Sequence, residues 1–386
     1  MLEMGKPFEA ALKEVDGTAE TLEYHAKNAK QLLAGERLKQ NGVEMRIDFA
    51  PSGVWGVITP WNYPFSIPFD AIAPCLLLGN TLVLKPAEST TLTGLELKKV
   101  LARAGLPKGV ISTIVGGEKT GRVLVKSDVN GIFFVGSTAA GKNIFLNSAP
   151  HLHKLVLELG GSDPAIVCGD VDANSAAAGV VRTRFNNCGQ VCCAAKRVFV
   201  DERIAKKFVS MVVEKTRSLK VGSGLTPKVD VGPLSSKAQL KLVETQVADA
   251  VKKGARVLVG GRRLKGKGFF FKPTVLVGVK KNMRVMREEV FGPVMPIASF
   301  KKLDDAIKEA NNTSYGLGAY IWTSNKKKAL EIAERLEAGT VWTNGWMWAD
   351  SCPWGGTKQS GFGRTGGRYG VESFSNIKTV YLRQVK

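Results

Sequence analysis

Short apolar segments alternate with helical segments along most of this chain, and the alternation limits the folds open to it. In the first half, four apolar segments have the length of buried strands: 53–58, 81–84, 110–115 and 131–135. Helical patterns separate them, as at 92–104. Strands that alternate with helices favour an α/β fold with a doubly wound parallel sheet, whose ligands bind at the carboxyl ends of the strands.

The alternation resumes after residue 160. Predicted strands lie at 165–167, 197–200, 255–259 and 295–298, and predicted helices at 204–219 and 327–336. An amphipathic helix opens the chain within 6–33, and the last apolar segment, 379–382, has the character of a strand that could pair with a neighbouring subunit. We therefore predict two α/β domains joined near 158–162.

Composition excludes several classes of protein. The chain has 386 residues, 44% of them hydrophobic, which is enough for more than one core. No apolar run is long enough to cross a bilayer, and the first eleven residues include Glu3, Lys6 and Glu9 rather than a signal peptide. The sequence therefore predicts a cytoplasmic protein without a membrane partner.

The net charge of +21, from 55 basic and 34 acidic residues, raises the question of a nucleic-acid partner. The basic residues are dispersed through helical segments, as at 326–328, and lack the aromatic interleaving of a single-strand binder. A lysine-rich solvated surface is the better interpretation, and no nucleic-acid partner is predicted.

Three of the six cysteines lie in one loop, 185–193, which reads FNNCGQVCC. A disulfide scaffold does not fit so few cysteines, and a metal site lacks both paired CxxC spacing and more than three histidines. Glu158 precedes this loop and could serve a thiol within it, because a thiolate with a proton-accepting partner is a nucleophile for covalent catalysis. The residues alone leave Cys192 as either a nucleophile or a buried thiol.

A glycine-rich turn follows the predicted strand at 131–135 and opens a helix. It contains Gly136, Ser137, Gly141 and Lys142, in the order that lets backbone N–H groups and a helix dipole hold a phosphate. A nucleotide triphosphatase loop would need a hydroxyl residue after the lysine, where this chain has Asn143. A phosphate-binding role is therefore favoured, and an NTPase is a minor alternative.

Seven motifs in a fixed order give a specific resemblance. They are 58–64 (ITPWNYP), 85–88 (KPAE), 136–138 (GST), 158–161 (ELGG), the loop of Cys192, 288–293 (EEVFGP) and 354–361 (WGGTKQSG). In this order, between about residues 6 and 378, the chain resembles the NAD(P)-dependent aldehyde dehydrogenases, and its motifs are most like those of the succinate-semialdehyde dehydrogenase branch.

The resemblance implies a domain plan. Residues 1–160 would form a Rossmann-like cofactor-binding domain, with arm strands near 32–50 for oligomerisation. Residues 161–361 would form an α/β catalytic domain, and 362–386 a C-terminal segment with an oligomerisation strand. A homodimer or homotetramer is expected.

The resemblance also implies an oxidation of an aldehyde to a carboxylic acid. Cys192 would attack the aldehyde carbon, and the side-chain amide of Asn62 with the backbone N–H of Cys192 would hold the oxyanion of the thiohemiacetal. After hydride transfer, Glu158 would activate the water that hydrolyses the thioester. Cys192, Glu158 and Asn62 are the predicted catalytic residues.

The cofactor, NAD or NADP, would be held by residues spread along the chain. The resemblance gives them as Pro60, Trp61, Lys85, Glu88, Gly136, Ser137, Glu289 and Phe291. Lys85 and Glu88 match positions at the adenosine ribose. A carboxylate there accepts hydrogen bonds from ribose hydroxyls and repels a 2′-phosphate, so NAD is slightly favoured.

Two features depart from the family. The chain begins later than family members usually do, and Thr365 stands where many members carry an acid, so a proton relay through that position is not expected. An inactive short form that acts as a binding protein is therefore an alternative to an enzyme.

The substrate is less specified by the sequence. Asn186 occupies the place of an arginine that grips the distal carboxylate in some succinate-semialdehyde enzymes. Tyr63, Trp348 and Phe374 could line an apolar tunnel or lie in the core. A small aliphatic aldehyde or succinate semialdehyde is a weak preference.

Overall fold

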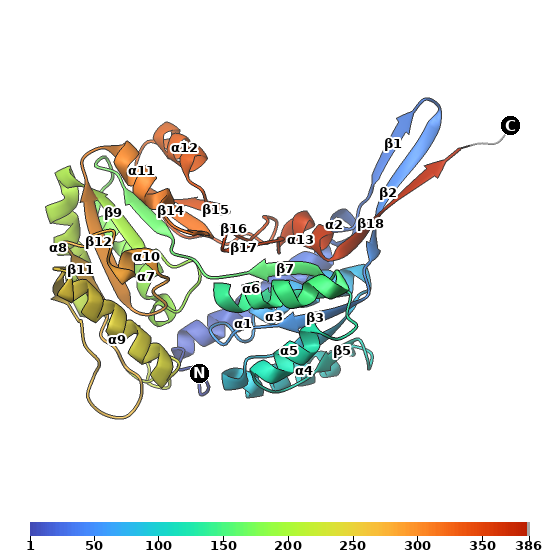
Figure 1. Ribbon diagram of the computed structural model, residues 1–386, viewed down its shortest axis with the longest axis horizontal. Helices are drawn as coiled ribbons and strands as arrows, with labels where there is room; N and C mark the ends of the chain where they lie inside the picture. The colour runs from blue at the N-terminus through green and yellow to red at the C-terminus, as the bar shows by residue number, and fades with distance from the viewer. Residues whose placement is uncertain (384–386) are drawn as a thin grey trace. The chain divides into compact units, whose positions relative to one another are not determined.

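The computed structural model describes residues 1–383, and the chain divides into two compact units (Figure 1). Unit 1 comprises Met1–Leu12, Leu159–Trp348 and Gly356–Ser360, and unit 2 comprises Lys13–Glu158, Ala349–Gly355 and Gly361–Lys386. The chain therefore leaves unit 2 at Glu158 and enters unit 1 at Leu159.

Unit 2 is built on a six-stranded sheet of order β17-β7-β6-β3-β4-β5. Its strands are β3 (Val54–Ile58), β4 (Thr81–Lys85), β5 (Ile111–Thr113), β6 (Gly131–Val135), β7 (Lys154–Glu158) and β17 (Gly361–Phe362). All neighbours are parallel except β17, which is antiparallel to β7. The doubly wound parallel sheet predicted from the alternation is confirmed, and β7 is a strand that the sequence analysis missed.

Most helices of this part of the chain fall between its strands, and α1 (Phe8–Lys27) and α2 (Ala29–Leu32) precede them. The others are α3 (Ile67–Leu78), α4 (Thr91–Arg103), α5 (Glu118–Val125), α6 (Thr138–Ser148) and α13 (Gly367–Ser373), with short 3-10 turns η1 (Glu88–Thr90) and η2 (Ala149–His151). The predicted helix at 92–104 is α4.

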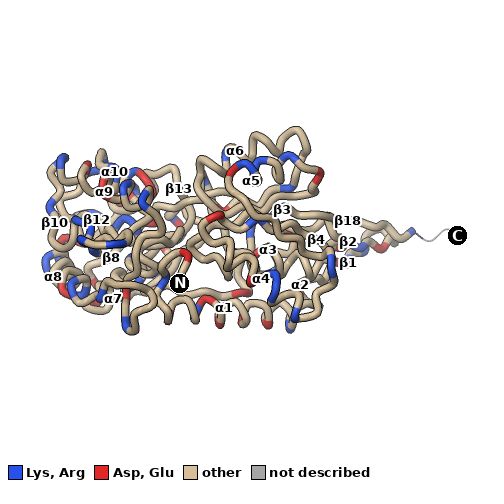
Figure 2. Tube along the Cα trace, turned by 90° about the horizontal axis from the view of Figure 1, so that it is seen from below, with Lys and Arg blue, Asp and Glu red and all other residues tan. Residues whose placement is uncertain are grey.

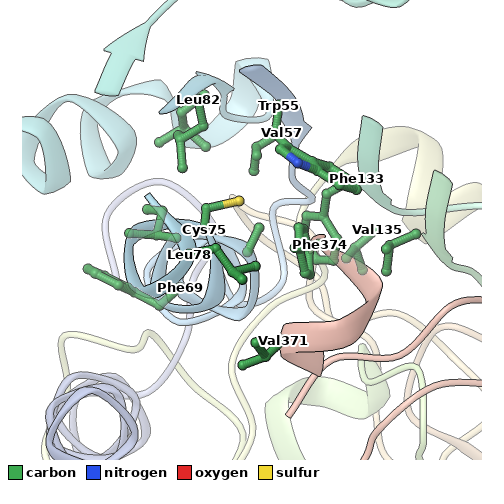
Figure 3. Close-up of a cluster of buried hydrophobic side chains, with 14 of the residues drawn as sticks. Trp55, Val57, Phe69, Cys75, Leu78, Leu82, Phe133, Val135, Val371 and Phe374 are labelled. Carbon is green, nitrogen blue, oxygen red and sulfur yellow. The ribbon is translucent and has the colours of Figure 1, made fainter. Parts of the chain in front are cut away.

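Aliphatic and aromatic side chains together fill the core of unit 2 (Figure 3). The ring of Phe374 lies 4.5 Å from that of Trp55 on β3 and 5.9 Å from that of Phe133 on β6, and all three side chains are fully buried. Burial of such a side chain stabilises a fold by roughly 2–3 kcal/mol. Of the two alternatives left open for Phe374, a tunnel or the core, the structure shows the core.

A separate three-stranded antiparallel sheet extends unit 2. It contains β1 (Glu36–Gln40), β2 (Val43–Pro51) and β18 (Ser375–Leu382), with β2 in the middle. Asn41 and Gly42 join β1 to β2 with φ of 50° and 76°, as a two-residue hairpin turn requires. The predicted strand at 379–382 lies in β18 and pairs with β2 of the same chain; its pairing with another subunit remains a prediction.

Unit 1 contains a seven-stranded sheet of order β10-β11-β12-β9-β8-β14-β15. Its strands are β8 (Pro164–Val167), β9 (Arg197–Asp201), β10 (Arg256–Val259), β11 (Thr274–Val277), β12 (Val294–Phe300), β14 (Gly318–Trp322) and β15 (Thr340–Thr343). Only the pair of β10 and β11 is antiparallel. The four predicted strands of this half are confirmed.

Helices and short pairings complete unit 1. They are α7 (Ala173–Phe185), α8 (Glu202–Ser218), α9 (Lys237–Lys252), α10 (Arg284–Arg287), α11 (Leu303–Asn311), α12 (Lys326–Arg335), the 3-10 turn η3 (Asn186–Gly189), and the strand pair β13 (Tyr315–Gly316) and β16 (Thr357–Lys358). The predicted helices at 204–219 and 327–336 are α8 and α12.

Basic residues occur on helices and strands of both units (Figure 2). Several of them, such as Lys27, Lys99 and Arg122, form exposed ion pairs with acids one turn away on the same helix. Within residues 1–383, no helix has the length and apolar character needed to span a bilayer.

Candidate active site

Glu158 is the last residue of β7 and its carboxylate is fixed by two hydrogen bonds. The hydroxyl of Thr365 donates to its Oε1 and the indole N–H of Trp354 to its Oε2, each over 2.7 Å. Burial raises the pKa of Glu158 to about 7, against the two hydrogen bonds and the charge of Arg364, which lower it. A carboxyl group that titrates near neutrality can accept a proton from water at physiological pH.

The two donors of Glu158 are held to each other by their backbones. The N–H of Trp354 donates to the carbonyl of Thr365 over 2.7 Å, and the N–H of Thr365 donates back over 2.9 Å. Both side chains therefore reach the same carboxylate from one small antiparallel bridge. Thr365, where we expected no proton relay, is a direct hydrogen-bond partner of Glu158.

A second carboxyl group, that of Asp70 on α3, is electrostatically linked to Glu158. Burial raises the pKa of Asp70 well above its usual range, and the charges of Glu158 and Asp350 raise it further. Burial and the two neighbouring carboxylates thus disfavour the charged form of Asp70.

The carboxyl ends of neighbouring strands in unit 2 bring most of the predicted cofactor residues to one edge of the sheet. Pro60–Asn62 follow β3, Lys85 ends β4, Gly136 and Ser137 follow β6, and Glu158 ends β7. The strand order reverses between β3 and β6, because the chain first runs from β3 to β5 and then returns to β6 on the other side. Such a switch point is where dinucleotides bind in open α/β sheets.

The turn between β6 and α6 has the features of a phosphate site. Ser137 caps α6, accepting a hydrogen bond from the N–H of Ala140 over 3.3 Å, and a Cβ on Gly136 would lie 2.4 Å from the ring of Phe134. Only glycine fits there, and the backbone stays open at a helix N-terminus. These residues fit a pyrophosphate.

Lys85 and Glu88 form the next part of this edge. The ammonium of Lys85 donates to the carbonyl of Pro86 over 3.0 Å, and burial lowers its pKa, while the charge of Glu88 acts in the other direction. Glu88 begins the η1 turn and is exposed. A ribose hydroxyl could therefore meet the carboxylate, as the sequence analysis expected of this position. Asn62 is buried.

The cysteine loop of unit 1 is tightly turned. Asn187, Cys188 and Gly189 have φ of 49°, 58° and 69°, three successive left-handed residues after α7. A Cβ on Gly189 would lie 2.3 Å from the carbonyl oxygen of Gly292. Backbone strain of this kind is typical of functional loops.

The thiols of the loop differ in their surroundings. Burial raises the pKa of Cys188 to about 12, so that this thiol stays protonated. Cys192 and Cys193 are half-buried and not in a disulfide, and the carbonyl of Cys193 accepts a hydrogen bond from the hydroxyl of Tyr320 over 2.7 Å. Among the described residues, no group of three or more His, Cys, Asp and Glu is arranged to hold a metal.

Two buried cations brace this loop. The guanidinium of Arg184 on α7 donates to the carbonyls of Gly189, Val290, Gly292 and Val294, the last over 2.6 Å. The ammonium of Lys196 donates to the carbonyls of Val191, over 2.9 Å, and Cys192. The loop is therefore held from both sides.

Glu289 and Phe291 lie on the segment that Arg184 braces. The Oε1 of Glu289 accepts a hydrogen bond from the N–H of Gly161 over 3.1 Å and lies 3.4 Å from the ammonium of Lys196. That ammonium is also 6.0 Å from the ring centre of Phe291. Unit 1 thus gathers Cys192 and two predicted cofactor residues around Lys196, and unit 2 carries the other predicted site residues.

Comparisons with known proteins decide the family. The sequence model of the aldehyde dehydrogenase family matches residues 1–380. The chain belongs to the aldehyde dehydrogenase family. This confirms the resemblance given by the seven motifs and makes the protein an NAD(P)-dependent aldehyde dehydrogenase.

Three proteins illustrate which members of the family the chain is similar to. A probable succinate-semialdehyde dehydrogenase [NADP(+)] of Sinorhizobium fredii is 41% identical over 97% of this chain and 78% of its own length. Retinaldehyde dehydrogenase 3 of Homo sapiens is 39% identical over 99% of this chain and 76% of its own length. An NAD+ complex structure of aldehyde dehydrogenase from Bacillus cereus has a TM-score of 0.95 at 36% identity, and the match covers 99% of this chain and 78% of that one.

Aldehyde dehydrogenases use NAD or NADP, and the residues of unit 2 fit such a cofactor. The tight glycine turn at the start of α6 and the switch point between β3 and β6 are the observations that support the fit. When bound, the cofactor supplies the acceptor for a hydride.

Several residues of the candidate site were not predicted from the sequence. They are Arg184, Lys196, Trp354 and the contact of Thr365 with Glu158. Arg184 lies in a largely polar stretch, 182–187, and Lys196 stands beside a second basic residue, Arg197, so nothing in the sequence signals that either is buried. Trp354 and Thr365 act on a residue roughly 200 positions away in the chain, and no local pattern indicates this.

Proposed function

We propose that this aldehyde dehydrogenase oxidises its substrate through a covalent intermediate on Cys192. The thiolate adds to the aldehyde carbon to form a thiohemiacetal, whose oxyanion is held by the backbone N–H of Cys192 and the side-chain amide of Asn62. Loss of a hydride to the cofactor leaves a thioester. Water activated by Glu158 then releases the carboxylic acid and restores the thiol.

One observation carries this proposal: the buried carboxylate of Glu158 has a pKa of about 7 and two fixed donors. Thioester hydrolysis needs a base that is unprotonated at neutral pH and basic enough to take a proton from water. An ordinary exposed glutamate is a much weaker base, because its pKa lies near 4.3.

The proposed cofactor roles are those that the family resemblance implies. Gly136 and Ser137 bind the pyrophosphate at the start of α6, with Pro60 and Trp61 along the same edge of the sheet, and Lys85 and Glu88 meet the adenosine ribose. Glu289 accepts hydrogen bonds from the nicotinamide ribose, and Phe291 packs near the nicotinamide ring. The free carboxylate of Glu88 favours NAD over NADP.

A small aliphatic aldehyde or succinate semialdehyde is the proposed substrate. The name of the Sinorhizobium relative, a probable succinate-semialdehyde dehydrogenase, supports succinate semialdehyde. Asn186 is exposed and uncharged, so it supplies no cation for a distal carboxylate, and this observation favours the uncharged aliphatic aldehyde.

The proposed assembly is a homodimer or homotetramer formed through the sheet of β1, β2 and β18. All five residues of β1 are exposed, and an edge strand presents unpaired N–H and carbonyl groups to a partner. Light scattering of the intact protein would give the mass of the assembly, and a monomer would contradict the proposal.

Initial rates with a panel of aldehydes, each with NAD and with NADP, test the reaction. The Cys192→Ala variant is expected to lose turnover, whereas its matched control Cys193→Ala keeps it. Glu158→Gln should give one burst of reduced cofactor per active chain and then stop, because the thioester forms but is not hydrolysed. Turnover by Cys192→Ala would contradict the covalent mechanism.

A further inference from the structure

Lys196 is a lysine with no exposed side-chain surface, and its ammonium makes two hydrogen bonds and one ion pair. Its ammonium donates to the carbonyl oxygens of Val191, over 2.9 Å, and of Cys192, and it lies 3.4 Å from Oε1 of Glu289. A lysine carries three N–H donors and no acceptor. Its hydrogen-bonding capacity is therefore directed at the backbone of the nucleophile loop and at one carboxylate.

Through its hydrogen bond to Val191, Lys196 is connected to the proposed oxyanion site by a single peptide group. The carbonyl of Val191 and the N–H of Cys192 belong to the same peptide bond. That bond is trans, as are all peptide bonds in the described residues. In a planar trans peptide the N–H points away from the carbonyl oxygen, so fixing the oxygen also fixes the direction of the N–H.

The charge of Lys196 also affects the strength of the Cys192 N–H as a hydrogen-bond donor. A hydrogen bond from a cation is shorter and stronger than one between neutral groups, and it polarises the amide that accepts it. The N–H of Cys192 thereby becomes a better donor to a negative oxygen. Oxyanion stabilisation depends on donors that are aimed in advance at the charge that develops.

We propose that Lys196 is a positioning residue for the oxyanion site: its ammonium aims and polarises the peptide between Val191 and Cys192. This inference rests on the proposed function, in which the N–H of Cys192 donates to the thiohemiacetal oxyanion. The ion pair with Glu289 keeps the ammonium in place, and the N–H of Gly161 donates a hydrogen bond to the same Oε1 of Glu289.

Two other routes for Lys196 have different consequences. Acting through Glu289, it would affect only steps that need the cofactor. Acting by its charge on the thiolate, it would affect every reaction of Cys192 equally. An oxyanion route affects reactions at a carbonyl carbon, with or without cofactor, and spares reactions that form no oxyanion.

Three reactions of the intact protein separate these routes. The first is the aldehyde dehydrogenase turnover, and the second is acylation of Cys192 by p-nitrophenyl acetate without cofactor, in which the thiolate displaces p-nitrophenolate. The third is alkylation of Cys192 by iodoacetamide, which displaces iodide and forms no oxyanion; peptide mass spectrometry assigns the modified cysteine.

The Lys196→Met variant removes the charge and the donors while keeping the length of the side chain. We expect dehydrogenase kcat and ester acylation to fall together by about 10- to 100-fold, with the KM for cofactor and the alkylation rate near wild type. Lys253→Met is the matched control, because Lys253 also donates to a carbonyl, that of Asn282, and pairs with a carboxylate, that of Asp249. It should leave all three reactions unchanged.

A second variant is used if Lys196→Met does not fold. If thermal unfolding shows that Lys196→Met is not native, Lys196→Gln is compared with the wild type instead, because its amide keeps N–H donors without the charge. Its losses should be smaller but divided among the three reactions in the same way. An equal fall in all three reactions, or a loss confined to the dehydrogenase, overturns the inference, as does no loss at all. A wild-type protein without turnover would instead refute the proposed function.

Discussion

The hydroxyl of Thr365 donates a 2.7 Å hydrogen bond to Oε1 of Glu158, the carboxylate that ends β7. This bond lowers the pKa of Glu158, while burial raises it, and the balance gives a value of about 7. A single hydroxyl therefore helps to set the pH at which the proposed base becomes active.

The Thr365→Val variant removes this hydrogen bond with little change in shape. Because the bond favours the charged carboxylate, its loss should raise the pKa of Glu158 further. The acidic limb of the kcat profile should then move to higher pH by about one unit, with activity recovered at alkaline pH. A pH series of initial rates measures this. Thr365→Ser should restore the wild-type profile, and an unmoved profile in Thr365→Val would contradict the role.

Arg184 is a second buried group, and it is predicted to stabilise the folded protein. The Arg184→Met variant leaves the carbonyls of Gly189, Val290, Gly292 and Val294 without their donor, so the free energy of unfolding should fall by about 3 kcal/mol or more. Arg182 is an exposed arginine of the same helix, so Arg182→Met should lower the free energy of unfolding only slightly. Urea unfolding of both variants measures the difference. Equal stabilities would argue against the bracing of the loop.

The fold could be predicted from the sequence because most of its parallel strands have apolar, buried centres. β6, with all five residues buried, is the simplest case. β7 was missed because lysine begins it and glutamate ends it, although its middle is buried. α3 was missed because it is apolar on all sides and contains Pro74, so that no helical periodicity shows.

The site was predicted less completely. Cys192, Glu158 and Asn62 follow from motifs, since each motif is local in sequence. Lys196 follows the loop of Cys192 and has the appearance of a surface charge until the fold places it against two carbonyls and Glu289. The donors to Glu158 come from the far end of the chain, and only the tertiary structure brings them there.

Gly160 is predicted to control the position of Glu289. A Cβ at this position would lie 2.3 Å from Oε2 of Glu289, so Gly160→Ala should displace the carboxylate and weaken its bond to the N–H of Gly161. If Glu289 holds the nicotinamide ribose, the KM for cofactor should rise by about tenfold.

Gly17→Ala is the matched control for this substitution. Gly17 lies within α1 and has open space around its Cα, so alanine should raise stability by about 0.5–1 kcal/mol and leave the KM for cofactor unchanged. Steady-state kinetics at varied cofactor concentration measures both variants. An unaltered KM in Gly160→Ala would mean that Glu289 does not contact the cofactor.

Cofactor choice is predicted to depend on the exposed carboxylate of Glu88. A 2′-phosphate placed near this carboxylate meets a like charge, and Lys85 offsets it only in part because its ammonium is turned toward the carbonyl of Pro86. Glu88→Gln should therefore raise kcat/KM for NADP relative to NAD by about tenfold. The control is Glu96→Gln, an exposed acid on α4 that pairs with Lys99. A ratio that moves equally in both variants would reflect the overall charge of the protein, whereas a change in Glu88→Gln alone would place the adenosine ribose beside this residue.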